Sequence, residues 1–384
     1  MVVHLWDLKT VSVKLKLDLH SLIKNRMKSY RLTKRKLYNL AKIEDYSFFS
    51  FSNILKYKYF KNNFIPLRLI MKIMDMLKIN KDKIYDYIIS YKTSNGINNI
   101  SSPKLPFSRN VFTSILFAHH IGDGTPIRPK DRLPYFGYRQ FDGIYRNSYI
   151  TKLKSAFGEI NFKKGYSDNS TRPYCPASCS EALCKIYGVT FSDSLSKKAR
   201  IPKLLFNSSK EEKISFLIGL IIDDGYVDST DIVIGLKNKK LVADLKILCS
   251  DLDYDCCITF NKEYGYLYIL REGMEKLYDD FLELNGKYPE IDLGYKGDQM
   301  RHSFLIKERK IIRTKGNKEI ILKLMENKSL TVNEIAKLIK MTRQGVRYHI
   351  KNLLKDDKIC IVSKFNENNY IYGVKNAYRN SRES

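Results

Sequence analysis

Two apolar segments that each end in Asp-Gly constrain the fold of this chain more than any other feature. The first, LFAHHIGDG, covers residues 116–124, and the second, LIGLIIDDG, covers residues 217–225. An apolar run of this length with a glycine after it is typical of a buried helix that ends at the glycine. Because the segments align without a gap and lie 101 residues apart, they predict two copies of one structural unit.

The two helices are expected to pack against each other along their small residues. A glycine or alanine at the contact lets two helix backbones approach closely, and apolar neighbours keep the pair buried. Pairing would bring the terminal acids Asp123 and Asp224 to one point. The small residues expected at the contact are Ala118, Gly122 and Gly219.

The converging carboxylates predict a metal site. The C-terminal end of a helix is the negative end of its dipole, so two buried acids there are unfavourable unless a cation compensates them. Oxygen ligands from few carboxylates favour Mg²⁺, or Mn²⁺. Asp123 and Asp224 are therefore predicted to bind the metal ion and to be catalytic, and the expected chemistry is metal-assisted phosphodiester hydrolysis.

A similar order of elements follows each apolar helix. In the first copy we expect a strand at 133–141, a helix at 148–157, strands near 160 and 174, and a helix at 180–187. In the second we expect a strand at 231–237, a helix at 240–252, a hairpin at 257–271, and a helix at 273–284. This mixture of helices and antiparallel strands indicates an α+β fold.

Both nonapeptides resemble the motif of the LAGLIDADG homing endonucleases, in their archaeal-like, monomeric form with two motifs. The resemblance covers residues 108–284. It implies two pseudo-symmetric αββαββα repeats, a saddle-shaped antiparallel sheet, a long double-stranded DNA target and a role in intron mobility. It also implies that the eighth-position acids, Asp123 and Asp224, bind the metal ion. The chain departs from the motif at the sixth position, with Ile121 and Ile222, and at the seventh position of the second copy, with Asp223.

A lysine of the sheet polarises the attacking water in this family, which makes Lys262 the candidate here and Lys164 its counterpart in the first copy. A solvated contact to a DNA phosphate is the alternative for both. His119 and His120 are expected to be helix-face residues rather than metal ligands, because they precede the helix end by about one turn.

Alternation along the second-copy strand predicts which side chains meet DNA. One face should pack on helices and the other should enter the major groove, although the assignment can shift by one residue. The inward set is Ile232, Ile234 and Leu236, and the outward set is Val233, Gly235 and Lys237.

The flanking regions read as DNA-binding modules. We expect a helical domain resembling a helix-turn-helix at 1–92, a linker at 93–107, the repeats at 108–196 and 212–300 with a connector at 197–211, and a winged helix-turn-helix at 315–376. A basic helical scaffold with a solvated face is the alternative for the first module. In the last module, the residues expected to contact DNA are Arg343, Gln344, Arg347, Tyr348 and Lys351.

Charge and composition support a nucleic-acid partner. Lys and Arg number 68 against 41 for Asp and Glu, a net charge of +27, which favours a polyanion. The seven cysteines are expected to be free thiols, because they are odd in number and no fourth ligand stands near Cys175, Cys179 and Cys184 to complete a zinc site. No apolar run is long enough to span a membrane and no signal peptide is evident, so a cytoplasmic, nucleoid-associated protein is expected.

These features predict a monomeric, Mg²⁺-dependent, site-specific endonuclease of double-stranded DNA. Two alternatives remain open. One is a catalytically inactive relative kept as a DNA-binding transcriptional regulator, and the other is an RNA-binding intron splicing factor of the same fold.

Overall fold

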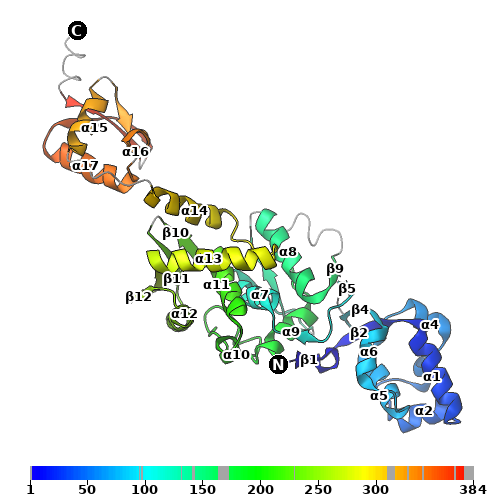
Figure 1. Cartoon of the computed structure of the whole chain (residues 1–384). Helices are drawn as coiled ribbons and strands as arrows, with labels where there is room; N and C mark the ends of the chain where they lie inside the picture. The colour runs from blue at the N-terminus through cyan, green and yellow to red at the C-terminus, as the bar shows by residue number, and fades with distance from the viewer. Residues whose placement is uncertain are drawn as a thin grey trace. The chain divides into compact units, whose positions relative to one another are not determined.

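The computed structural model describes residues 2–94, 96, 98–130, 132–140, 143–162, 173–228, 230–308, 316–326, 328–339, 341–366 and 369–375. The chain divides into two compact units, residues 1–303 and 304–384 (Figure 1). Helices and antiparallel sheets occur in both units. The chain is therefore an α+β protein, as its sequence predicts.

The first part of unit 1 combines short helices with a sheet. Side-chain caps start two of the helices, since Thr33 accepts a hydrogen bond from the Lys36 backbone N–H and Ser47 accepts one from that of Ser50. The helices are α1 (Leu17–Ser29), α2 (Lys34–Leu40), α3 (Phe48–Ile54), α4 (Tyr57–Asn62), α5 (Leu67–Met76) and α6 (Ile84–Tyr87), with the 3-10 turns η1 (Leu5–Asp7) and η2 (Lys81–Lys83).

Strands also cross this region, which corrects the prediction of a purely helical module followed by a linker. The five-stranded sheet has the order β3-β2-β4-β5-β9. In the predicted linker, Ile100 is fully buried and pairs with Tyr91 on one side and Ile160 on the other, so an apolar anchor holds this segment in the sheet. The strands are β2 (Val11–Leu15), β3 (Ile65–Pro66), β4 (Ile88–Thr93), β5 (Asn99–Ser101) and β9 (Glu159–Asn161), while β1 (Val2–Val3) pairs with β6 (Phe107–Ser108).

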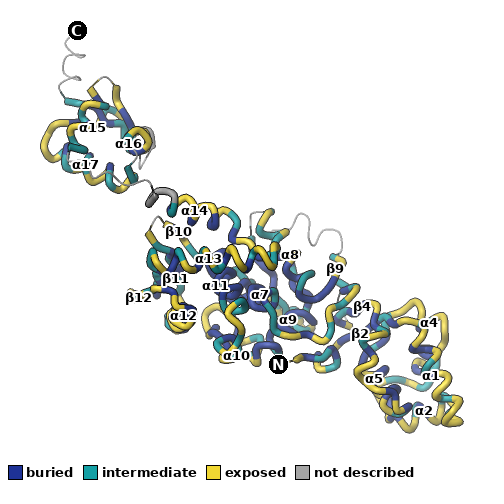
Figure 2. The backbone as a smooth tube through the Cα atoms, viewed as in Figure 1, coloured by how far each residue is buried: buried dark blue, intermediate teal, exposed yellow. Residues whose placement is uncertain are grey.

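Two buried helices, α7 (Val111–Ile121) and α11 (Lys210–Asp224), pack against each other within unit 1 (Figure 2). The absence of a side chain at Gly219 allows the close approach, because a Cβ built there would lie only 2.6 Å from the Cβ of Ala118. Asn110 and Ser209 cap the two helices through their side chains.

The second copy forms a regular four-stranded sheet covered by helices. Its order is β10-β11-β13-β12, and every neighbouring pair is antiparallel. Ile232 and Ile234 are fully buried, Leu236 is half-buried and Lys237 is exposed, in agreement with the predicted alternation. The elements are β10 (Gly225–Val227), β11 (Asp231–Leu236), α12 (Lys239–Asp251), β12 (Cys256–Phe260), β13 (Gly265–Leu270) and α13 (Arg271–Lys287).

The first copy is less regular than predicted. Its strands β7 (Gly124–Ile127) and β8 (Tyr135–Tyr138) form a separate two-stranded sheet, followed by α8 (Gly143–Phe157) and α9 (Ala177–Ile186). The strand predicted near Ile160 exists, but it joins β5, where Ile160 pairs with the buried Ile100. Tyr174 makes only an isolated bridge to Gly137. In the described residues the two sheets are not continuous, so a single saddle is not observed.

Helix α10 (Lys203–Phe206) lies between the two copies, and helix α14 (Tyr295–Glu308) follows the second copy. Helix α14 runs across the boundary between the units. No helix in the described parts of the chain combines the length and apolarity needed to cross a membrane.

Unit 2 contains three helices and a three-stranded sheet of order β14-β16-β15 in its described residues. Thr342 caps the third helix by accepting a hydrogen bond from the Gly345 backbone N–H, as its sequence predicts. Val346, Ile350 and Leu353 bury one face of that helix in the core. The elements are α15 (Asn317–Met325), β14 (Leu330–Thr331), α16 (Val332–Ile339), α17 (Arg343–Lys355), β15 (Ile359–Asn366) and β16 (Asn369–Val374).

Candidate active site and DNA interface

The candidate site lies where α7 and α11 end. Asp224 is the last residue of α11, and Asp123 follows the C-cap of α7. Glycine is required directly after Asp123, because a Cβ built at Gly124 would lie 2.1 Å from the carbonyl oxygen of His120. The chain therefore turns sharply from each helix into its first strand, which leaves the acids at the helix ends.

Asp123 and Asp224 are only partly exposed and influence each other. Burial is the main cause that raises the pKa of each carboxyl to about 7. Repulsion from neighbouring carboxylates raises both further, from Asp223 on Asp123 and from Asp223 and Asp123 on Asp224. Three acids thus share one small region.

Asp223 is the buried member of this group. Its carboxylate accepts hydrogen bonds from the Tyr138 hydroxyl at 2.7 Å, from His119 Nδ1 at 3.1 Å and, more weakly, from the Asp123 backbone N–H at 3.4 Å. The space for it comes from Gly122 on the partner helix, where a Cβ would lie 2.6 Å from Asp223 Oδ2. The seventh motif positions of the two copies are therefore complementary, glycine facing aspartate.

His119 is a buried residue of α7 whose side chain contacts the site, which the prediction of a helix-face residue did not anticipate. Its side chain is 1% exposed and connects Asp223 to Lys152, whose Nζ lies 3.4 Å from His119 Nε2. Burial, followed by the nearby Lys152, lowers the pKa of His119 well below its usual value. A neutral ring with its proton on Nδ1 satisfies both contacts, because Nδ1 donates to the carboxylate and Nε2 accepts from the lysine.

His120 is also buried on α7. Its Nε2 lies 2.9 Å from the Tyr149 hydroxyl, and its ring stacks on Phe136. It belongs to the packing behind the site, since the helix turns its side chain away from Asp223.

Lys296 of α14 is the cation that sequence reasoning missed. It is 5% exposed and donates to the carbonyl oxygens of Ile221 at 2.6 Å and Ile222 at 2.7 Å in the last turn of α11. Its charge lowers the pKa of Asp123, Asp223 and Asp224 against the effect of burial. Lys296 lies 72 residues after Asp224 and belongs to no recognisable motif, so the sequence alone provides no reason to select it.

Lys262 does not approach these acids. It is exposed in the turn between β12 and β13, where its carbonyl oxygen accepts a hydrogen bond from Lys239 Nζ. The order β10-β11-β13-β12 separates this turn from β10, the strand that follows Asp224. A lysine in a hairpin turn extends beyond the paired strands, so the role predicted for Lys262 stays a prediction. Lys164, its predicted counterpart, lies outside the described residues.

The donor set fits a hard cation held by few protein ligands. Asp123 and Asp224 offer carboxylate oxygens, and the Gln140 side-chain amide donates to one oxygen of Asp123. Where side chains are described, no group of three or more His, Cys, Asp or Glu is arranged to hold a metal ion. Mg²⁺ fits this geometry, because it commonly binds one or two carboxylates and completes its shell with water and phosphate.

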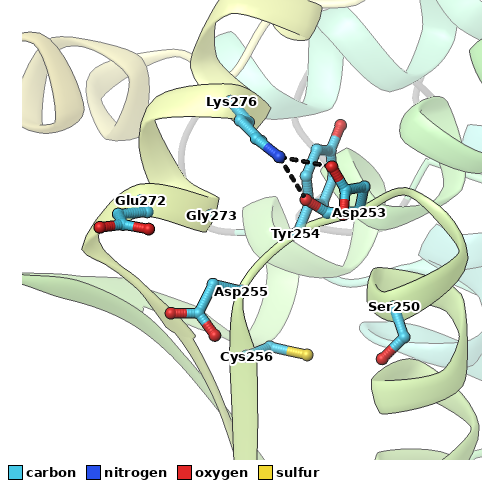
Figure 3. Close-up of a pocket in the computed structure, with 8 residues that line it drawn as sticks. All are labelled: Ser250, Asp253, Tyr254, Asp255, Cys256, Glu272, Gly273 and Lys276. Atoms are coloured by element: carbon cyan, nitrogen blue, oxygen red, sulfur yellow. Dashed lines mark hydrogen bonds and ion pairs between the residues drawn. The ribbon is translucent and has the colours of Figure 1, made fainter.

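A depression in the surface lies outside this site. It has a volume of about 410 Å³ and is lined by Ser250, Asp253, Tyr254, Asp255, Cys256, Glu272, Gly273 and Lys276 (Figure 3). Lys276 already pairs with Asp253 at 2.5 Å. A hydrogen bond with Cys249 lowers the pKa of the Cys256 thiol to about 7. All seven cysteines are free, as expected from their number and spacing.

In unit 2, α17 presents a polar surface of the kind predicted for DNA contact. Arg343, Gln344, Arg347, Tyr348 and Lys351 are all exposed, opposite the buried face of the helix. Tyr348 is 66% exposed. The preceding helix α16 and the strand pair β15-β16 complete a winged helix-turn-helix arrangement.

Comparison with known proteins identifies this unit. A family model described as winged helix-turn-helix DNA-binding matches residues 317–359. Residues 317–359 form a winged helix-turn-helix domain. The chain therefore carries a DNA-binding domain, with α17 in the position of its recognition helix.

No curated protein matches the chain. Among solved structures, the chain is similar to the homing endonuclease I-WcaI bound to its DNA recognition sequence, with 16% sequence identity, 46% of this chain and 83% of that chain covered, and a TM-score of 0.32. At that TM-score the likeness supports no statement about fold or activity.

Proposed function

We propose that the chain is a monomeric, Mg²⁺-dependent, site-specific endonuclease of double-stranded DNA, of the LAGLIDADG homing type. The observation that carries the proposal is the convergence of Asp123, Asp223 and Asp224 at the paired ends of α7 and α11. Burial raises the pKa of all three carboxyls and repulsion raises those of Asp123 and Asp224 further, so the charge of Lys296 only partly compensates the acids. A divalent cation would offset the charge of these carboxylates, and a phosphate group of the DNA would complete the coordination shell of that cation.

Each residue of the site has a distinct part in the proposal. Asp123 and Asp224 hold the metal ion, which when bound supplies Lewis acidity to the phosphodiester. Asp223 keeps the end of α7 in place through the Asp123 backbone N–H, and His119 and Tyr138 orient Asp223. Lys296 binds the last carbonyl groups of α11 and offsets part of the negative charge, which makes it a better candidate than Lys262 for the site lysine.

The winged helix-turn-helix domain extends the DNA contact in this proposal. Arg343, Gln344, Arg347, Tyr348 and Lys351 of α17 read or hold the major groove. Lys237, exposed at the end of β11, contributes a phosphate contact. Such contacts on two units would allow one copy of the chain to bind a long asymmetric site.

Cleavage of a randomised duplex DNA library in Mg²⁺ tests the proposal. We expect site-specific double-strand cuts, which Asp123→Asn and Asp224→Asn abolish while the variants remain folded. Asp279→Asn is the control, because Asp279 is an exposed acid on α13 away from the helix ends. Failure of the wild-type chain to cut in Mg²⁺ or Mn²⁺ would refute the endonuclease.

A DNA-binding transcriptional regulator is the second candidate. The observation in its favour is that the winged helix-turn-helix is the part of the chain matched by a family model. Tight, sequence-specific binding without metal-dependent cutting is the result expected for a regulator.

A further inference from the structure

One face of the sheet β10-β11-β13-β12 carries a row of tyrosines. Tyr226 of β10 pairs with Val233 of β11, which in turn pairs with Tyr268 of β13. Two residues further along β11, Gly235 pairs with Tyr266 of β13. Cross-strand partners in an antiparallel sheet share a face. The opposite face holds the buried residues Ile232, Ile234, Leu267 and Ile269. The tyrosines therefore lie on the face that the core does not use.

The rings follow β13 at regular intervals. The ring centroids of Tyr264 and Tyr266 are 6.1 Å apart, and those of Tyr266 and Tyr268 are 6.4 Å apart. Tyr266 lies across Gly235, where a Cβ would be 3.0 Å from its Cε1. Tyr226, on the edge strand β10, is 64% exposed. Glycine thus leaves room for a ring to lie along the sheet and present its face.

The surroundings of the rings are neutral or positive along most of the row. The cross-strand partners of Tyr266 and Tyr268 on β11 and β12 are all uncharged, namely Val233, Gly235, Cys257 and Thr259. Lys237 lies at the Tyr264 end, with its Nζ 5.6 Å from the centroid of that ring. Asp231 lies at the opposite end of β11. The row has the aromatic and cationic groups that bases and phosphates prefer.

The spacing discriminates between paired and unpaired DNA. Side chains two residues apart on a strand repeat about every 6.8 Å. Each strand of a duplex advances about 3.4 Å per nucleotide, and its base faces are covered by neighbouring bases. Only bases that have left the stack can lie one to a ring, as an extended single strand allows.

We infer that this tyrosine row, Tyr226, Tyr264, Tyr266 and Tyr268, binds unpaired bases of single-stranded DNA. DNA is the occupant because the same chain carries a DNA-binding winged helix. Stacking on tyrosine tolerates any base, so the row contributes affinity for an opened strand rather than readout of its sequence. The inference deepens the proposed function by naming an opened strand as part of the substrate, yet it does not depend on cleavage.

Binding to a labelled 20-nucleotide single strand, to the same sequence as a duplex, and to the matching RNA strand tests the inference. The full chain is used in EDTA, so that cutting plays no part, and fluorescence anisotropy reports affinity over a range of salt. Tyr266→Leu removes a ring, Tyr266→Phe keeps it, and Tyr226→Leu changes the most exposed ring. Phe260→Leu is the matched control, because Phe260 is a 51% exposed aromatic residue that pairs with Gly265 on the opposite face.

Loss of a ring should weaken single-strand binding by about 5- to 150-fold, the range for one stacked base. Duplex affinity should fall by less than single-strand affinity, Tyr266→Phe should restore binding, and Phe260→Leu should have no effect. The slope of log affinity against log salt should be unchanged in Tyr266→Leu but fall by about 0.7 in Lys237→Ala, because only the lysine neutralises a phosphate.

Equal weakening for duplex and single strand, no weakening in folded Tyr226→Leu, or tighter binding to RNA than to DNA would overturn the inference. Binding in EDTA and cutting in Mg²⁺ by the wild-type chain separate the two proposals, since a chain that binds the single strand but does not cut refutes the endonuclease alone.

Discussion

Asp123, Asp223 and Asp224 show how burial and crowding act on single residues. Their pKa values are all raised to about 7, with burial as the first cause. A carboxyl with a higher pKa in the folded than in the unfolded chain binds its proton more tightly when folded. Its stabilising effect is present at low pH and is lost as pH rises through the folded value.

We therefore expect the free energy of unfolding of unit 1 to fall between pH 5 and pH 8 in EDTA. Mg²⁺ should reverse this fall, because it binds the ionised site, and at about 100 times its Kd it should add about 2.7 kcal/mol at pH 8. The gain at pH 5 should be smaller, since protons then occupy the carboxyls. Melting curves with and without Mg²⁺ at both pH values measure the difference. An equal Mg²⁺ effect in Asp224→Asn would show that the ion binds elsewhere.

At the scale of elements, the close contact between α7 and α11 depends on the lack of a side chain at Gly219. Gly219→Ala would place a Cβ 2.6 Å from that of Ala118 and 3.0 Å from the carbonyl oxygen of Ile115. The helices would have to separate, at a cost of about 1–3 kcal/mol. Urea unfolding of the variant should show a lower midpoint with an unchanged slope.

Gly286→Ala is the control for this substitution. It adds the same methyl group to α13, where nothing lies within 4 Å, and should stabilise the helix by about 0.5–1 kcal/mol. Two glycine substitutions in helices of one unit are thus expected to have opposite signs. A stabilising Gly219→Ala would contradict the tight packing.

For the whole molecule, unit 2 should add affinity without affecting the stability of unit 1. Arg347→Ala removes an exposed side chain from α17 and should weaken specific DNA binding by the full chain by about 1–3 kcal/mol. Lys318→Ala, which removes one surface ion pair with Asp356, should change binding little. Titration of both variants with duplex DNA at matched salt distinguishes them, and equal effects would exclude α17 as the reading helix.

Sequence pattern predicted the parts of the molecule whose structure is local. The winged helix-turn-helix and the regular second copy follow from apolar periodicity, helix caps and strand alternation, as the buried Ile232 and Ile234 illustrate. The same reasoning did not predict how the strands of the first copy pair. Ile160 has the alternation of a strand, but only the fold shows that its partner is Ile100 rather than a neighbour in its own repeat.

The site residues also divide into those that the sequence predicted and those that it did not. Asp123 and Asp224 could be selected because the repeat aligns them, whereas Lys296 carries no signal of its own and reaches the site only through folding. Asp223 was visible as a departure from the motif. Its hydrogen bonds to His119 and Tyr138 depend on contacts between distant segments, which no spacing rule encodes.

The facing of Gly122 and Asp223 restricts how the two halves of this chain can diverge. If both copies descend from one ancestor, the space at position 122 had to open before an aspartate could be accepted at position 223, because a Cβ at 122 would collide with its carboxylate. The path back is also closed to single steps. Loss of the aspartate would leave His119 and Tyr138 without their acceptor, and a larger residue at 122 cannot enter while the aspartate remains. Substitutions at 122 and 223 are therefore expected to be coupled rather than independent.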